Sequence, residues 1–84
     1  MRLAEARDAV RTRHDLARFV DALRRDLDAN EEAWENPTLD RYLEALSGWI
    51  ADMEGWFANR GVPEPEQPDW NLVGHMLYAA KVYE

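Results

Sequence analysis

The sequence NPTLDRYLEALSGWIADMEGWFANRGVP, residues 36–63, decides the fold. Its apolar residues recur at spacings of three and four, as they do on one face of an α-helix. They are Leu39, Tyr42, Leu46, Trp49, Met53 and Trp56, with Leu43, Ile50 and Phe57 beside them. Pro37 fits the first position of a helix, so we expect Asn36 to cap it, and Gly61 can adopt the left-handed conformation that ends one. The stretch predicts one helix over residues 37–60, with an apolar face wide enough to hold two other helices.

A second helix is predicted before this stretch. Thr12 followed by Asp15 matches the signal in which a hydroxyl caps the first turn and an acidic residue sits near the positive helix end. Apolar residues then recur at helical spacing at Leu16, Phe19, Val20, Leu23 and Leu27. The pattern predicts a helix over residues 12–28. Residues 1–11 are rich in Arg and Ala and predict a frayed N-terminal helical arm.

The third helix follows a proline-rich connector. Residues 61–68 contain three of the four prolines and predict a stiff extended segment. Asp69 then caps a helix over residues 69–84. Because 84 residues suffice for one small domain, we expect a single domain over residues 1–84. Its predicted fold is an all-α three-helix bundle with helix 37–60 at the centre.

The charge is uneven along the chain. Seventeen acidic and ten basic residues give a net charge of -7, with +3 over residues 1–25 and -10 over residues 26–84. Nucleic-acid binding draws most of its affinity from neutralising phosphates, so an acidic chain is a poor candidate for it. The charge favours a basic protein as the partner.

The residue inventory excludes several kinds of site. There is no cysteine, so a disulfide framework, a cysteine zinc site and a thiol nucleophile are excluded. No run approaches the roughly 20 apolar residues of a membrane span, and no signal peptide is recognisable, so we expect a cytoplasmic protein and no membrane partner.

Catalysis has few candidates. Ser47 is the one serine and has no histidine near it in sequence, while His14 and His75 belong to different predicted helices. We therefore expect no catalytic residue, metal site or cofactor. The pair Glu31 and Glu35 leaves open a small enzyme that uses carboxylates as acid and base.

Candidate partner-binding residues gather at two places before the last helix. We expect an acidic group at one bundle end, made of Glu31, Glu32, Glu35, Asp40 and Glu44. Trp34 among them either closes that end or anchors a partner, while Trp49, Trp56 and Trp70 are expected to pack in the core. Gly48 and Gly55 lie opposite the apolar face of their helix, where glycine is unfavourable, so a close approach there is a second candidate. The alternative is sequence drift on an exposed face that tolerates an isolated glycine.

The last helix carries a third candidate surface. Tyr78 and Val82 lie roughly opposite its core-facing arc, on a stripe that includes His75. Contact with a second chain would explain this stripe, and so would cover by the arm around Leu3 and Val10. The alternative is that Tyr78 and Val82 are two tolerated apolar residues at the surface.

Several short motifs together resemble a known family. They are Trp34-Glu35-Asn36, Leu39, Tyr42-Leu43-Glu44-Ala45-Leu46, Trp49, Asp52-Met53, Trp70 and Tyr83-Glu84. In combination, over residues 12–84, they resemble a family of small bacterial domains of unknown function. The resemblance implies a bacterial, self-contained helical unit, and it implies no activity, cofactor or catalytic residue.

Size, charge and inventory favour one function over two others. We expect a non-enzymatic protein-interaction module, such as an acidic inhibitor or immunity-type protein that neutralises a basic partner. A homodimeric structural or regulatory subunit is the alternative, and a small enzyme using acidic residues is the second alternative.

Overall fold

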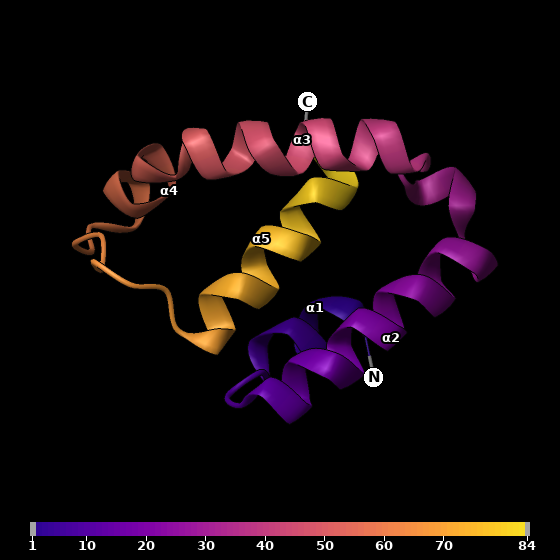
Figure 1. Ribbon diagram of the computed structural model, residues 1–84, viewed down its shortest axis with the longest axis horizontal. Coiled ribbons are helices and arrows are strands. Elements are labelled where there is room, and N and C mark those ends of the chain that lie inside the picture. Colours follow the sequence, from indigo (N-terminus) through magenta and orange to yellow (C-terminus); the bar gives the residue numbers. More distant parts are fainter. Residues whose placement is uncertain (1, 84) are drawn as a thin grey trace.

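The computed structural model describes residues 2–83, and helices are its only regular structure within them. In chain order these are α1 (Leu3–Asp8), α2 (Arg13–Ala29), the 3-10 helix η1 (Glu31–Ala33), α3 (Leu39–Ala51), α4 (Met53–Arg60) and α5 (Trp70–Val82) (Figure 1). The predicted all-α class is confirmed. Met1 and Glu84, which end the predicted arm and the predicted last helix, lie outside the described residues. No helix within residues 2–83 has the length and apolar character that crossing a membrane requires.

α2 starts at a reciprocal cap. The Thr12 hydroxyl accepts a hydrogen bond from the backbone N–H of Asp15 at 3.1 Å, and the Asp15 carboxylate accepts one from the N–H of Thr12 at 3.2 Å. These bonds satisfy donors that a helix start leaves without partners. On the apolar face Phe19 and Leu23 are buried. The observed bounds lie within one residue of the predicted helix 12–28.

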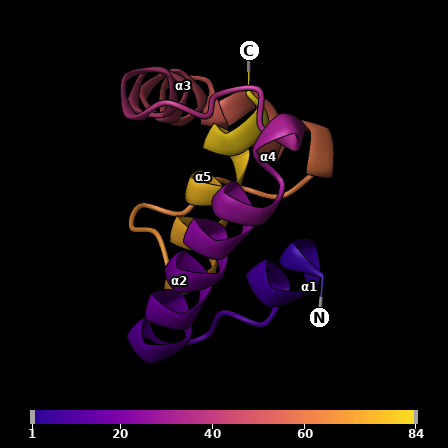
Figure 2. The same cartoon turned by 90° about the vertical axis from the view of Figure 1, so that its right-hand side faces the viewer.

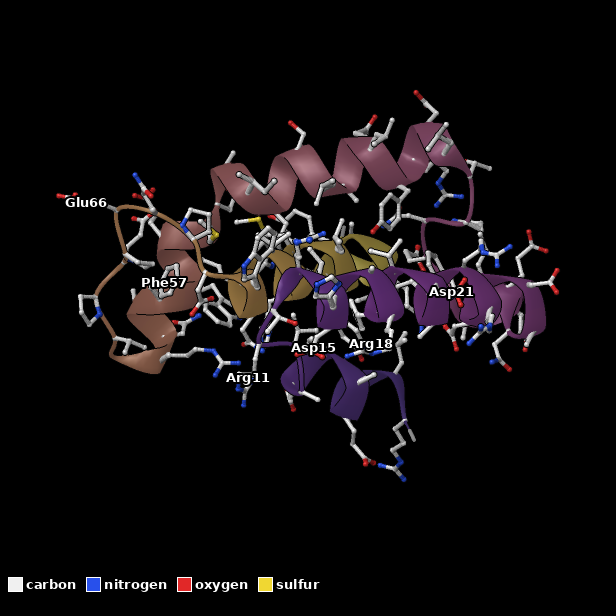
Figure 3. All side chains as sticks on the ribbon, turned by 60° about the horizontal axis from the view of Figure 1, so that its bottom comes forward. Arg11, Asp15, Arg18, Asp21, Phe57 and Glu66 are labelled. Atoms are coloured by element: carbon white, nitrogen blue, oxygen red, sulfur yellow. The ribbon has the colours of Figure 1, made fainter. Side chains whose placement is uncertain are left out.

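The outer face of α2 carries ion pairs at helical spacing. Arg18 pairs with Asp15, and Asp21 pairs with Arg24 at 2.9 Å and also with Arg25. Figure 3 shows Asp15, Arg18 and Asp21 along this helix. Exposed pairs of this kind contribute only a few tenths of a kcal/mol each, so this face is solvated and does not hold the fold together.

α3 is capped by Thr38, and the predicted cap Asn36 has a different role. The Thr38 hydroxyl accepts a first-turn backbone N–H at 3.3 Å. Asn36 is only 7% exposed, and its Nδ2 donates to the carbonyl oxygens of Ala80 at 3.0 Å and Tyr83 at 2.8 Å. Its backbone N–H donates to the carbonyl of Lys81 at 3.1 Å. These bonds satisfy carbonyls at the end of α5 and tie the α2–α3 connection to it.

The prediction of one helix over residues 37–60 is wrong, because the helix is interrupted at Asp52. The N–H of Gly55 donates to the carbonyl of Asp52 at 3.0 Å, so a bond across three residues replaces the helical bond across four. The Asp52 carboxylate accepts a hydrogen bond from the Tyr83 hydroxyl. Asp is a weak helix former, and here a residue beyond α5 holds its side chain.

α5 occupies the centre that the sequence assigned to residues 37–60. It packs against α1, α2 and α3, whereas α2 and α3 do not pack against each other within the described residues (Figures 1 and 2). α3 therefore holds one helix rather than two. Gly74 and Ala80 are buried on different sides of α5 and let neighbours approach closely. α5 is apolar on most sides, and it is therefore covered on most sides. The molecule as a whole is flat and measures 36 × 27 × 17 Å.

Two apolar clusters lie on either side of α5. The first consists of Val10, Phe19, Leu23 and Trp34. The second consists of Trp49, Phe57 and Leu72, with Trp56 half-buried against it. Trp70 does not pack as predicted and is 46% exposed, because the connector that precedes it, residues 61–68, is exposed throughout and offers no cover.

The N-terminal arm is packed rather than frayed. Val10 is 1% exposed, and its Cγ2 lies 3.5 Å from where a Cβ on Gly74 would stand. The side-chain amide of Asn71 donates to the carbonyl of Val10 at 2.9 Å and to that of Arg7 at 3.1 Å. The structure shows the arm against His75 and Tyr78 of the stripe on the last helix, while Val82 of the same stripe stays exposed.

The end of α4 follows its sequence signal. Gly61 has φ 68° and ψ 28°, in the left-handed region that favours glycine. The N–H of Gly61 donates to the carbonyl of Ala58 and the N–H of Val62 to that of Phe57, both at 3.2 Å. This pair of bonds is the Schellman motif, which ends the helix and starts the connector.

We expect Asn36→Ala to lower the free energy of unfolding by about 1–3 kcal/mol, because it leaves the buried carbonyl of Ala80 without its donor. Asn59→Ala, at an exposed position of α4, should change it by less than about 0.5 kcal/mol. Urea denaturation followed by tryptophan fluorescence measures both. Equal effects would contradict the structural role of Asn36.

Candidate functional site

The predicted acidic residues lie on the connection between α2 and α3. Glu31 and Glu32 belong to η1 and Glu35 follows it, and all three are exposed. Asp40 and Glu44 on α3 are exposed as well. No carboxylate of these five is in an ion pair within residues 2–83. Their negative charge therefore faces solvent.

Trp34 closes this end of the molecule. Its ring is buried, and its Nε1 donates to the Asp26 carboxylate at 2.8 Å. The ring centroid lies 6.0 Å from that of Tyr42. Of the two roles predicted for Trp34, the structure shows that it closes this end of the molecule. Its ring is buried and does not project from the surface as an anchor for a partner would.

A shielded ion pair fixes α2 to α5 nearby. Lys81 Nζ lies 2.9 Å from the Asp26 carboxylate. Burial alone would raise the pKa of Asp26, but hydrogen bonds from Lys81, Trp34 and Asn30 outweigh it and hold that pKa below its ordinary value. Asp26 is therefore charged at neutral pH, and its charge is used within the fold.

An apolar groove of about 340 Å³ lies between α2 and the start of α3. Its side chains come from α2, the connection, α3 and α5, and include Val20, Leu23, Leu27, Trp34, Pro37, Leu39, Tyr42 and Leu77. The Tyr42 hydroxyl donates to the carbonyl of Leu77 at 2.7 Å and braces α3 against α5. Burial raises the pKa of Tyr42 to about 12, so the hydroxyl remains a donor at any working pH.

The apolar surface continues from the groove along α3. Leu39 is 73% exposed, Leu43 is 52% exposed, and Ile50 is also exposed on the same face of the helix. Sequence periodicity correctly placed these residues on an apolar face, but it could not show that half of this face is left uncovered. The groove was therefore not predicted from the sequence, and the width of the apolar face of residues 37–60 was the one indication of it.

The two candidate glycines, Gly48 on α3 and Gly55 on α4, have different surroundings. A Cβ on Gly48 would stand 3.2 Å from Cε2 of Tyr83, which is a tight contact. A Cβ on Gly55 would meet nothing within 4 Å. The close approach predicted at these two glycines therefore occurs at Gly48, where the contacting residue is Tyr83 of the same chain.

We expect Gly55→Ala to stabilise the fold by about 0.5–1 kcal/mol, because alanine costs less backbone entropy in a helix and has room there. Gly48→Ala should gain less or destabilise, since its methyl group presses on the ring that holds Asp52. Thermal unfolding of the two variants gives the comparison. A larger gain for Gly48→Ala would show that Tyr83 does not need this glycine.

The stripe on α5 meets the arm and α4. The His75 side chain is largely buried, with Nε2 3.8 Å from the Asp8 carboxylate, and the Arg7 guanidinium stands 4.5 Å above the Tyr78 ring. Burial first, and then repulsion from Arg7, lowers the pKa of His75. Val82 remains exposed. The three stripe residues are thus brought together on a face of α5 away from the groove.

Metal ligands are not assembled in the part of the chain that the structure describes. No group of three or more His, Cys, Asp or Glu side chains lies close enough to hold a metal ion among these residues.

Comparison with known proteins gives one match. The model of a family of unknown function (DUF7660) matches residues 12–84. The predicted membership of a family of unknown function over this range is confirmed, and bacterial origin stays a prediction. No curated protein and no solved structure matches the chain.

Proposed function

We propose that this chain, which belongs to the DUF7660 family of unknown function, is a protein-interaction module that takes a basic amphipathic helix of another protein into the groove between α2 and α3. Binding of this kind would neutralise the partner, as an inhibitor or immunity-type protein does. The observation that carries the proposal is the open apolar groove between two helices that do not pack against each other.

The shape of the groove favours a helix as its occupant. α2 and α3 diverge from their connection with α5 between them (Figure 1), and side chains of both α2 and α3 line the groove. Amphipathic helices dock in such troughs through apolar residues at positions i, i+3, i+4 and i+7. A helix with this pattern would cover Val20 on one wall and Leu39 and Leu43 on the other, all of which are exposed.

The exposed area supports an interface of ordinary size. The chain has 5884 Å² of accessible surface for 9.8 kDa, whereas a compact monomer of this mass exposes about 5,200 Å². The excess of about 700 Å² is close to the roughly 800 Å² that each partner buries in a standard interface. The exposed apolar side chains Val20, Leu39, Leu43 and Ile50 contribute to this excess, as does the exposed connector over residues 61–68.

Charge favours a basic partner over a second copy. Residues 26–84 carry -10, and exposed acidic residues directly neighbour the groove in sequence, as Glu35 and Asp40 do. Arg24 at the groove is already paired with Asp21 at 2.9 Å. A second copy would bring its own net charge of -7 against the same acids, whereas a basic helix is attracted and steered by them.

We expect Leu39→Ser with Leu43→Ser to weaken binding of a basic helical probe at least tenfold, because both side chains are exposed and contribute apolar area only on binding. The probe is a synthetic peptide with leucines at helical spacing on one face and lysines on the other, measured by calorimetry. Val62→Ser, at an exposed connector position, is the matched control and should leave the affinity unchanged.

Two results would contradict this proposal. One is an affinity that the Leu39 and Leu43 substitutions leave unchanged. The other is a dimeric wild type, seen by light scattering, that the same substitutions convert to a monomer, because self-association would then explain the groove.

We expect replacement of Glu31, Glu32 and Glu35 by Gln to slow association of the same peptide several-fold at low salt, with little change in dissociation. The difference should vanish near 0.5 M salt, where the Debye length is only a few ångströms. Replacing Glu54, Glu64 and Glu66 by Gln changes the net charge equally at the opposite end of the molecule; Figure 3 labels Glu66 there. Equal slowing by both triple variants would show that only total charge matters.

A further inference from the structure

A second cavity lies on the other side of α5 and shares no lining residue with the groove. Its volume is about 480 Å³, within the range of pockets that hold small organic ligands. Side chains from α1, α3, α4 and α5 line it. On α5, His75 of this pocket and Leu77 of the groove point about 160° apart, at 100° per residue.

The walls of the pocket are aromatic. The Trp49 and Trp56 ring centroids are 5.7 Å apart in an edge-to-face arrangement, and the His75 ring lies 5.3 Å from Trp56. Tyr78 and Tyr83 complete the lining. Such rings offer faces and edges on which a flat ligand can stack.

The charged groups in the pocket are all cationic, in a chain that is otherwise acidic. Arg60 is one of only three basic residues beyond position 25. Its guanidinium stands 4.1 Å above the Trp56 ring, and it makes no ion pair within residues 2–83. Arg7 stands 4.5 Å above Tyr78 and is paired with the Asp8 carboxylate at 3.0 Å. No carboxylate lines the cavity.

We propose that this pocket binds a small planar aromatic anion of one or two rings that bears a carboxylate. The aromatic side chains that line the pocket contact the flat body, and the guanidinium of Arg60 pairs with the carboxylate, whose two oxygens match the geometry of a guanidinium fork. Arg7, which is paired with Asp8 at 3.0 Å, lies beside the site. The Arg60 guanidinium stacks on Trp56, which leaves its N–H groups free to donate in the plane.

The electrostatics of the pocket change when an anion enters. Without it, burial and repulsion from Arg7 and Arg60 disfavour the charged form of His75, while Asp8 and Asp69 favour it. A bound carboxylate offsets the repulsion from the two arginines and favours a proton on His75. Binding is therefore coupled to proton uptake, and affinity rises as pH falls from 7.5 to 5.5, a range in which an aryl carboxylate stays ionised.

The test uses 2-naphthoate as the anionic probe and 2-naphthalenemethanol as its neutral counterpart, both titrated by calorimetry. We expect 2-naphthoate to bind at least tenfold more tightly than the alcohol. Arg60→Gln should weaken 2-naphthoate at least fivefold and leave the alcohol unchanged. Arg41→Gln, which removes the same charge from an exposed position of α3 outside the pocket, should leave both unchanged.

The pH dependence is a second, independent readout. His75→Gln should remove the rise in affinity between pH 7.5 and 5.5, and circular dichroism checks that this variant is folded. Equal binding of the two probes, an equal loss in Arg41→Gln, or no binding of 2-naphthoate at millimolar concentration would overturn the proposal. Because Leu39→Ser and Leu43→Ser lie outside this pocket, failure here leaves the helix-binding groove standing, and the reverse also holds.

Discussion

The two halves of the molecule are joined through α5, which is the constraint on which the rest of the structure depends. The α1–α2 pair packs on it from one side and α3 from another, and α2 and α3 do not pack against each other within residues 2–83. Among these residues, only the Tyr42 side chain of α3 reaches the core cluster of the first half. The arrangement is fixed at the C-terminal end of α5 by the buried amide of Asn36 and by the Asp26–Lys81 pair. Each of these interactions is sheltered from water, so each is costly to lose, whereas the exposed ion pairs along α2 are not.

The sharing of α5 by both halves explains why the molecule has both the apolar groove and the aromatic pocket. When three helices pack pairwise, each fills the space between the other two; here α2 and α3 contact α5 but not each other, so a trough is left on one side. On the other side α1 and α4 flank α5 at its aromatic face and leave the pocket that contains Arg7 and Arg60. The two hollows differ in chemistry, since one is apolar beside acids and the other is aromatic beside cations. This difference is why we assign them different ligands.

Local signals predicted what local interactions decide. The capping box at Thr12, the left-handed Gly61 and the cap at Asp69 all depend on residues within a few positions of each other. Contacts between distant residues decided the rest. The neighbours of Asn36 in the sequence predict a helix cap, but its side-chain amide donates to carbonyls more than forty positions away. The helix is interrupted at Asp52, whose carboxylate accepts a hydrogen bond from the distant Tyr83. Periodicity likewise shows which face of a helix is apolar, but it does not show whether a neighbour covers that face, so the groove could not be predicted.

The N-terminal arm shows how a short segment can serve both stability and a site. Residues 2–11 lie outside the range that the family model matches, yet Val10 is among the two largest fully buried side chains. Its approach to α5 depends on Gly74, where a Cβ would reduce the space, and on Asn71, which binds the arm's carbonyls. Because these contacts fix the path of the arm, they also fix Arg7 above Tyr78, where it supplies one of the two guanidiniums of the pocket. The core contact of Val10 and the position of Arg7 are therefore linked, and the pocket has its second guanidinium only while the arm is docked.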